Sequence, residues 1–197
     1  MEGLAGYLVY ALGWLSFGFL HSLLAGDAVK ARLKARLGAG YRLAYNLFAT
    51  LHIAAVWLAG FALLSRETFA ALEGWTGLFP ALQGAGLVLG LFGLRGYDLG
   101  RFAGTAQLRW AKAGREEPED EPLRTQGLNR YLRHPLYTAA FLLLWGAALS
   151  EHGLATALWG SVYLFVGSVY EERRLHTRYG KAYGDYKART GRFIPRL

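Results

Sequence analysis

The sequence predicts an all-α, polytopic membrane protein with five transmembrane helices. Three observations lead to this prediction: long uncharged runs, a low content of charged residues and an uneven distribution of basic residues. Of 197 residues, 53% are hydrophobic and 18% are charged, whereas soluble domains average about 25% charged residues. This composition excludes an ordinary soluble globule, and the length predicts one integral membrane domain.

Five uncharged runs define the predicted crossings, at residues 3–26, 43–65, 74–94, 135–150 and 152–170. A helix needs about 20 apolar residues to cross the hydrocarbon core. The run 135–150 is shorter, but only Glu151 separates it from 152–170, which predicts a helical hairpin over 135–170. The first run begins after Glu2 rather than after basic residues and is too long for a cleaved signal peptide.

The basic residues predict the orientation. Every Lys and Arg except Arg66 falls between the first and second runs, between the third and fourth, or after the fifth. The positive-inside rule then places the N-terminus outside and the C-terminus in the cytoplasm. The net charge of +8 therefore indicates anionic membrane lipids as partners, and we expect no nucleic acid.

The chain contains no cysteine, which excludes disulfides, thiolate metal sites, iron–sulfur clusters and a cysteine nucleophile. We expect no metal site. Two cytoplasmic segments, 96–134 and 171–197, are long enough to carry function. Within the first, the acidic stretch 115–122 is predicted to be a solvated turn, and its aromatic and basic flanks are predicted to lie at the headgroup level. The chain thus divides into a three-helix part, 1–95, and a part bearing these cytoplasmic segments, 96–197.

Two charged motifs flank the predicted hairpin. His134 precedes Pro135, which favours a helix start, and a helix start attracts anions. Glu171 and Glu172 follow the last run, where an ionisable group is a functional candidate. Because a hairpin returns its two ends to one membrane face, His134 and Glu171 are predicted to converge. An anion-attracting group beside a carboxylate suits a zwitterionic amino acid head, and Tyr131, Tyr137 and Tyr170 could face a sulfonium.

These residues resemble the integral-membrane methyltransferases of the isoprenylcysteine carboxyl methyltransferase superfamily. The matching strings are Leu123-Arg-Thr-Gln-Gly-Leu-Asn-Arg-Tyr-Leu-Arg-His-Pro-Leu-Tyr137, and Glu171-Glu172 followed by Tyr179-Gly180 and Phe193-Ile-Pro195. The resemblance implies S-adenosylmethionine as cofactor, bound under the cytoplasmic loops. The cofactor-binding residues expected from the motifs and their surroundings are Gln107, Leu123, Arg124, Asn129, Tyr131, His134, Pro135, Leu136, Tyr137, Glu171 and Glu172.

Two further features bear on the methyl acceptor. Isoprenylcysteine enzymes carry an arginine for the substrate carboxylate one turn before the first glutamate, where this chain has Gly167, so prenylcysteine is not the expected acceptor. The N-terminal half is instead similar to bacterial methanethiol S-methyltransferases and to the NnrU family. On that similarity, His21, Tyr45 and Asn46 are candidate substrate contacts, and the bacterial inner membrane is the expected location.

The sequence therefore predicts an S-adenosylmethionine-dependent methyltransferase that acts on a small or lipophilic acceptor, with a thiol first. No catalytic base is evident, so catalysis is expected to be positional. The alternatives are a haem protein of the NnrU and zeta-carotene isomerase type, an NADPH enzyme of the sterol reductase type and a non-catalytic scaffold. His21 is left as a haem ligand, a substrate contact or an interhelical hydrogen-bonding group, and His52 is expected to be structural. The acceptor and the oligomeric state remain open.

Overall fold

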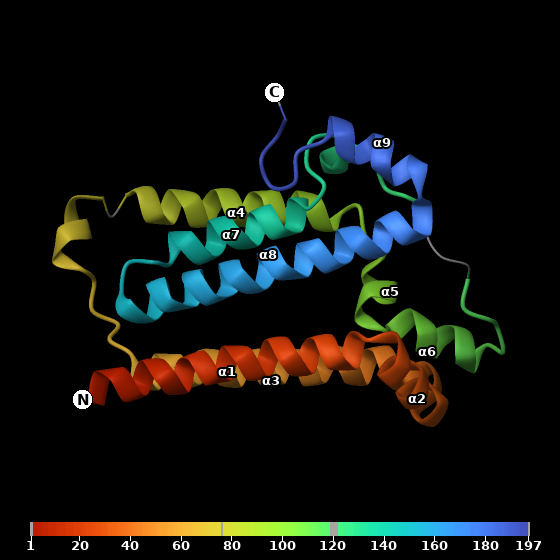
Figure 1. Ribbon diagram of the computed structural model, residues 1–197, viewed down its shortest axis with the longest axis horizontal. Helices are drawn as coiled ribbons and strands as arrows, with labels where there is room; N and C mark the ends of the chain where they lie inside the picture. Colours follow the sequence, from red (N-terminus) through yellow and green to blue (C-terminus); the bar gives the residue numbers. More distant parts are fainter. Residues whose placement is uncertain (1, 76, 119–121, 197) are drawn as a thin grey trace. The chain divides into compact units, whose positions relative to one another are not determined.

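The computed structural model describes residues 2–75, 77–118 and 122–196, and Figure 1 traces its helices. The predicted all-α class is confirmed for these residues, in which the extended structure is one isolated bridge between Leu132 and Gly191. Contacts divide the chain into two compact units. The first joins Met1–Leu64 with Tyr97–Asp120, and the second joins Ser65–Gly96 with Glu121–Leu197.

The first unit is built on two long apolar helices, α1 (Glu2–Ala25) and α3 (Tyr41–Leu63). They run antiparallel, because Gly13 faces Val56 and Gly60 faces the ring of Tyr10. The short basic helix α2 (Asp27–Leu37) and the 3-10 turn η1 (Gly38–Gly40) connect them. Small residues at these contacts let the backbones approach closely, as in other membrane helix pairs.

Two short helices, α5 (Leu99–Ala103) and α6 (Thr105–Lys112), complete the first unit. Asp98 caps α5 by accepting a hydrogen bond from the Arg101 amide at 2.9 Å. Gly104, between the two helices, has φ +98 and lies against the backbone at Leu43. A side chain there would meet both a strained backbone conformation and a steric overlap, so glycine is required.

The second unit contains the predicted hairpin, in which α7 (Pro135–Gly146) runs antiparallel to α8 (Glu151–Tyr179). The helix α4 (Leu78–Leu94) covers the other side of α7, and Figure 1 shows α7 between the two. Glycines carry both contacts, since Gly86 of α4 meets the α7 backbone and Gly160 of α8 meets Leu144. The sequence grouped α4 with the N-terminal helices, but in the structure it packs on α7.

The hairpin differs from its predicted bounds at both ends. The run 135–150 is helical only to Gly146, and the chain then turns before Ser150 caps α8 by accepting from the Gly153 amide. At the other end α8 continues to Tyr179. Glu171 and Glu172 were expected just after the end of the last helix, but they lie within α8. Arg173, Arg174, Leu175 and Arg178 after them are good helix formers, and the helix stops only at Gly180, where φ is +52.

Within the described residues, three helical segments are long and apolar enough to cross a membrane, namely Gly3–Ala25, Asp27–Leu63 and Glu151–Tyr179. The helix α4 has 17 residues and α7 has 12, and 12 residues span about 18 Å against a hydrocarbon core of about 30 Å. The run 74–94 becomes α-helical only at Leu78, after the 3-10 helix η2 (Ala70–Trp75). The count of five crossings and the orientation therefore stay predictions.

The contact of α4 with α7 predicts opposite effects of alanine at two glycines two residues apart on α4. A Cβ added at Gly86 would lie 2.8 Å from the carbonyl oxygen of Ala139, whereas one at Gly84 meets open space. We expect Gly86→Ala to destabilise the protein by about 1–3 kcal/mol through overpacking. Gly84→Ala should leave stability unchanged or raise it by up to about 1 kcal/mol. Thermal unfolding in detergent measures both, and equal midpoints would contradict this packing.

Candidate functional site

The start of α7 is fixed by its sequence. Pro135 occupies the first helical position and is fully buried, while His134 before it is outside helical geometry, at φ −125 and ψ 64. Proline at this position sets the helical φ and needs no amide hydrogen bond. The intrahelical hydrogen bonds begin with the Thr138 amide, which donates to the His134 carbonyl at 3.0 Å. The positive end of the helix dipole is therefore located at His134.

The structure brings His134 and Glu171 together. The imidazole Nδ1 lies 3.5 Å from Oε2 of Glu171, and Nε2 lies 3.3 Å from Oε1 of Glu172. His134 is only 4% exposed, so its ring is held between the two carboxylates. Glu171 keeps 39% of its side chain exposed, whereas Glu172 keeps 3%. The two adjacent glutamates therefore have different environments, which the sequence does not distinguish.

Glu172 is the centre of an ion-pair cluster that we define as Arg133, Lys187, Arg192 and Glu172. Its Oε1 accepts from Nε of Arg133 at 2.8 Å, and its Oε2 accepts from Arg192 at 2.9 Å and pairs with Lys187 at 3.1 Å. Lys187 and Arg192 were not among the predicted site residues. The only signal that could have indicated them is the abundance of basic residues in the segment 171–197, since nothing local in the sequence connects them to Glu172.

An aromatic group adjoins the cluster. The ring of Tyr137 stacks on His134 with centroids 5.1 Å apart, and the centroid of the Phe193 ring lies 5.8 Å from that of His134. Phe193 also contacts Phe141 of α7 at 4.9 Å. The predicted residue Leu136 packs against Gly93 of α4 instead. Of the expected residues, His134, Pro135, Tyr137, Glu171 and Glu172 thus form one contiguous site.

The remaining predicted residues of the second unit lie around the 3-10 turn η3 (Gly127–Arg130). The Asn129 amide donates to the Arg133 carbonyl at 3.3 Å, and the Asn129 carbonyl accepts from the Tyr186 hydroxyl at 2.6 Å. Asn129 thus connects η3 to the helix α9 (Lys181–Arg189). Leu123 is half-buried on the segment before η3, where the Arg124 guanidinium lies near Gly96 at the end of α4.

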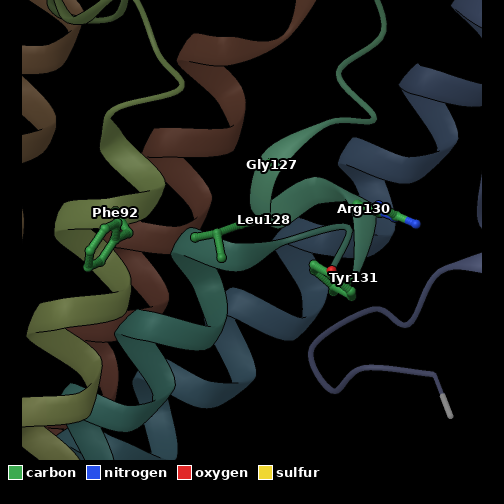
Figure 2. Close-up of a pocket in the computed structure, with 5 residues that line it drawn as sticks. All are labelled: Phe92, Gly127, Leu128, Arg130 and Tyr131. Carbon is green, nitrogen blue, oxygen red and sulfur yellow. The ribbon is translucent and has the colours of Figure 1, made fainter.

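Tyr131 lines a shallow cavity of about 480 Å³ on the second unit. Its other lining residues are Phe92, Gly127, Leu128 and Arg130, and Figure 2 shows Leu128 between Phe92 and Tyr131. Tyr131 is 57% exposed, and the Arg130 guanidinium lies 5.9 Å from its ring centroid. Tyr170, also expected to face a sulfonium, similarly has Arg173 over its ring at 5.7 Å. Tyr131 and Tyr170 thus lie beside arginines, whereas Tyr137 stacks on His134.

The other expected residues belong to the first unit. The Tyr45 hydroxyl and His21 Nε2 are 2.6 Å apart, which links α1 to α3. The Asn46 amide donates to the carbonyls of Phe102 and Ala103 at 2.8 and 3.0 Å, so it holds the end of α5. His52, expected to be structural, lies 3.0 Å from the Ser16 hydroxyl. His21 thus makes the interhelical hydrogen bond that was one of its three predicted roles.

Gln107 is buried on α6 and binds the acidic stretch that follows. Its amide nitrogen donates to Oε1 of Glu117 at 3.2 Å, and Lys34 of α2 donates to Oε2 at 3.1 Å. Partial burial opposes ionisation of Glu117, but these two hydrogen bonds outweigh it and lower the pKa below its usual value. Part of the predicted solvated turn, 119–121, lies outside the described residues. Glu117 itself forms an ordered contact with α2 and α6.

Tyr183 on α9 is buried beside the ion-pair cluster. Its side chain is 1% exposed, and its hydroxyl makes no hydrogen bond within the described part of the chain. Burial, together with the negative charge of Glu172, raises its pKa to about 12. Its ring centroid lies 6.1 Å from that of Tyr186, whose hydroxyl is hydrogen-bonded to Asn129.

Comparison with known proteins agrees with this part of the chain. Residues 114–182 match the model of the phospholipid methyltransferase family. The predicted resemblance to membrane methyltransferases is therefore confirmed for this segment, which includes the start of α7 and both glutamates. No solved structure matches the chain.

The curated relatives that match this chain are also named as methyltransferases. Methanethiol S-methyltransferase 2 of Bradyrhizobium diazoefficiens is 34% identical over 82 residues, which is 41% of this chain and 32% of that protein. Methanethiol S-methyltransferase of Pseudomonas deceptionensis is 30% identical over 82 residues, or 41% and 31% of the two chains. The aligned part covers about a third of the length of these curated relatives.

The arrangement can bind a molecule that carries both an ammonium and a carboxylate. The Glu171 carboxylate is partly exposed and can accept from an ammonium, while the helix start at His134 favours an anion. Glu172 has its hydrogen-bonding capacity taken up within the protein. Binding at this site would therefore use Glu171 and the first turn of α7.

The buried hydroxyl of Tyr183 predicts a stabilising substitution. An unsatisfied buried polar group costs about 1–3 kcal/mol, so Tyr183→Phe should raise the free energy of unfolding by about 1 kcal/mol. Tyr186→Phe is the matched control on the same helix, and it should lower stability because it leaves the Asn129 carbonyl without its donor. Thermal unfolding of both variants in detergent checks this. A midpoint of Tyr183→Phe below that of the wild type would contradict the environment described for this hydroxyl.

Proposed function

We propose that this protein is an integral membrane methyltransferase that uses S-adenosylmethionine to methylate a small or lipophilic thiol. The observation that carries the proposal is the approach of Glu171 to His134, 3.5 Å apart at one end of the α7–α8 hairpin. Both residues lie in the segment that matches the phospholipid methyltransferase family.

The residues at this site fit the amino acid portion of S-adenosylmethionine. Glu171 is 39% exposed, so its carboxylate retains room for an ammonium group. The first turn of α7 presents its positive end beside it, which suits a carboxylate. When bound, S-adenosylmethionine supplies a methyl group activated on a sulfonium. The proposed contacts for the rest of the cofactor are Gln107, Leu123, Arg124, Asn129 and Tyr131.

The site supports positional catalysis on an acceptor that ionises without help. A thiolate needs no strong base, so the protein has to hold the acceptor in line and exclude water. The rings of Tyr137, Phe193 and Phe141 supply an apolar lining near His134. The Tyr137 hydroxyl approaches the position of Gly167, where a carboxylate-binding arginine would be needed for a prenylcysteine. The names of the relatives favour a small thiol, and His21, Tyr45 and Asn46 stay candidate acceptor contacts.

The proposed topology follows the sequence. Five crossings with a cytoplasmic C-terminus would expose the start of α7 and the end of α8 to the cytoplasm, where S-adenosylmethionine is soluble. An apolar acceptor could enter from the lipid. The location proposed is a bacterial inner membrane.

The alternative functions have less support. A haem protein would use His21, but its Nε2 is occupied by the Tyr45 hydroxyl at 2.6 Å. A sterol reductase-like enzyme would bind NADPH, for which the sequence contains no dinucleotide-binding loop.

The experiment is a methyl-transfer screen with the purified protein in nanodiscs. Methyl-labelled S-adenosylmethionine is offered with a small thiol, a hydrophobic thiol, an isoprenoid acid and a phospholipid amine. We expect label in a thioether product, first with the thiols. Absence of transfer to all four acceptors, together with a Soret band in the purified protein, would favour the haem protein instead.

The proposed ammonium contact predicts the effect of one substitution. Glu171→Gln removes a charge-assisted hydrogen bond worth about 1.5–3 kcal/mol, so the Kd for S-adenosylmethionine should rise about 10- to 100-fold. Glu151→Gln is the matched control at the other end of α8, where Glu151 accepts from the Ser65 amide at 3.4 Å. Its Kd should stay within about twofold of the wild type. Calorimetric titration measures both values, and an unchanged Kd for Glu171→Gln would refute the contact.

A further inference from the structure

The side chain of Glu172 has no capacity left for a ligand. A carboxylate offers about four lone-pair sites. Its Oε1 accepts from Nε of Arg133 at 2.8 Å and from Nε of Arg192 at 3.1 Å, and His134 Nε2 lies 3.3 Å from the same oxygen. Its Oε2 accepts from Nη2 of Arg192 at 2.9 Å and pairs with Lys187 at 3.1 Å. With 3% of the side chain exposed, a cofactor ammonium could reach it only by displacing one of these cations.

The cations come from segments that are distant in the sequence. Arg133 lies two residues before Pro135, the first residue of α7, Lys187 lies on α9, and Arg192 follows α9. Arg133 also donates through Nη1 to the carbonyls of Thr190 and Lys187. One carboxylate on α8 therefore joins the start of α7 to the last part of the chain.

The backbone makes the same connection. The amides of Arg133 and His134 donate to the carbonyls of Gly191 and Arg192 at 2.8 and 3.1 Å. The Thr138 hydroxyl donates to the Phe193 carbonyl at 2.9 Å. The segment 190–193, which we call the C-terminal strap, thus lies along the start of α7 with the Phe193 ring near His134.

We propose that Glu172 is a positioning residue: it fastens the C-terminal strap across the start of α7 and thereby fixes the imidazole of His134 opposite Glu171. This differs from the expectation that Glu172 binds the cofactor. Removing the carboxylate would leave the Arg133 side chain, which is 9% exposed, without its counter-ion, which is strongly unfavourable, and Arg192 would lose its ion pair as well. The strap and the His134 backbone would then separate, and the site would lose its geometry.

The first test needs no cofactor. Amide hydrogen exchange at Arg133 and His134 reports directly on their hydrogen bonds to the strap. We expect Glu172→Gln and Arg192→Met to accelerate this exchange at least tenfold relative to the wild type. Glu171→Gln should leave it unchanged, because in the part of the chain that the structure describes Glu171 pairs with the His134 ring and not with the strap. Unchanged exchange in both strap variants would overturn the proposal.

The second test uses the cofactor and therefore rests on the proposed function. Arg192→Met changes a residue that is not a proposed cofactor contact, and we expect it to raise the KM for S-adenosylmethionine at least fivefold with kcat kept within about twofold. Arg192→Lys, which keeps the charge, should restore part of the affinity. If Glu172→Gln weakened binding while Arg192→Met did not, Glu172 would be a direct ligand and the proposal would be wrong.

The two tests separate the possible failures. If the wild type neither binds nor uses S-adenosylmethionine, the proposed function fails, and the exchange measurement alone decides the role of Glu172. Arg192 is 26% exposed, so its variants are expected to fold even if Glu172→Gln does not. Each variant is measured at a temperature that lies a fixed number of degrees below its own unfolding midpoint. A faster exchange or a weaker affinity is then not caused by global unfolding.

Discussion

The second unit depends on one buried carboxylate and the cations that surround it. Glu172 lies on α8, yet its partners belong to the segment before α7, to α9 and to the chain after α9. A buried charge is costly unless it is paired and hydrogen-bonded, so these four parts of the chain are forced into one arrangement. That arrangement sets the distance between His134 and Glu171, and the proposed chemistry follows from it.

Close helix packing positions the carboxylate. Glycines at 86 and 160 allow α4 and α8 to approach α7 from two sides, and van der Waals contact between such surfaces holds helices together where lipid removes the hydrophobic driving force. The helix α8 has 29 residues and is about 43 Å long. It therefore extends beyond the apolar run 152–170 and carries Glu171 and Glu172 on a rigid element, as a precise site requires.

Sequence reasoning succeeded where a property is local. Apolar runs predicted the helices, because burial of a helix in lipid depends on its own composition. The hairpin predicted that residues 134 and 171 return to one end, because the adjacent uncharged runs 135–150 and 152–170 have similar lengths and their outer ends meet when the helices lie antiparallel. Features that depend on distant parts of the chain could not be predicted from the sequence. The helix stop after Gly146 and the continuation of α8 to Tyr179 depend on turn and capping chemistry, which hydropathy does not report. The pairing of Glu172 with Arg192 joins residues 20 apart through a chain reversal that no spacing rule contains.

The central claim is that the start of α7 and Glu171 form a site for S-adenosylmethionine, and equilibrium binding to the wild-type protein in nanodiscs tests it most directly. We expect saturable binding of radiolabelled S-adenosylmethionine at one site per chain. S-adenosylhomocysteine, which keeps the same amino acid head, should displace the label, and NADPH should not. Absence of saturable binding, or displacement by NADPH at equal concentration, would contradict the account.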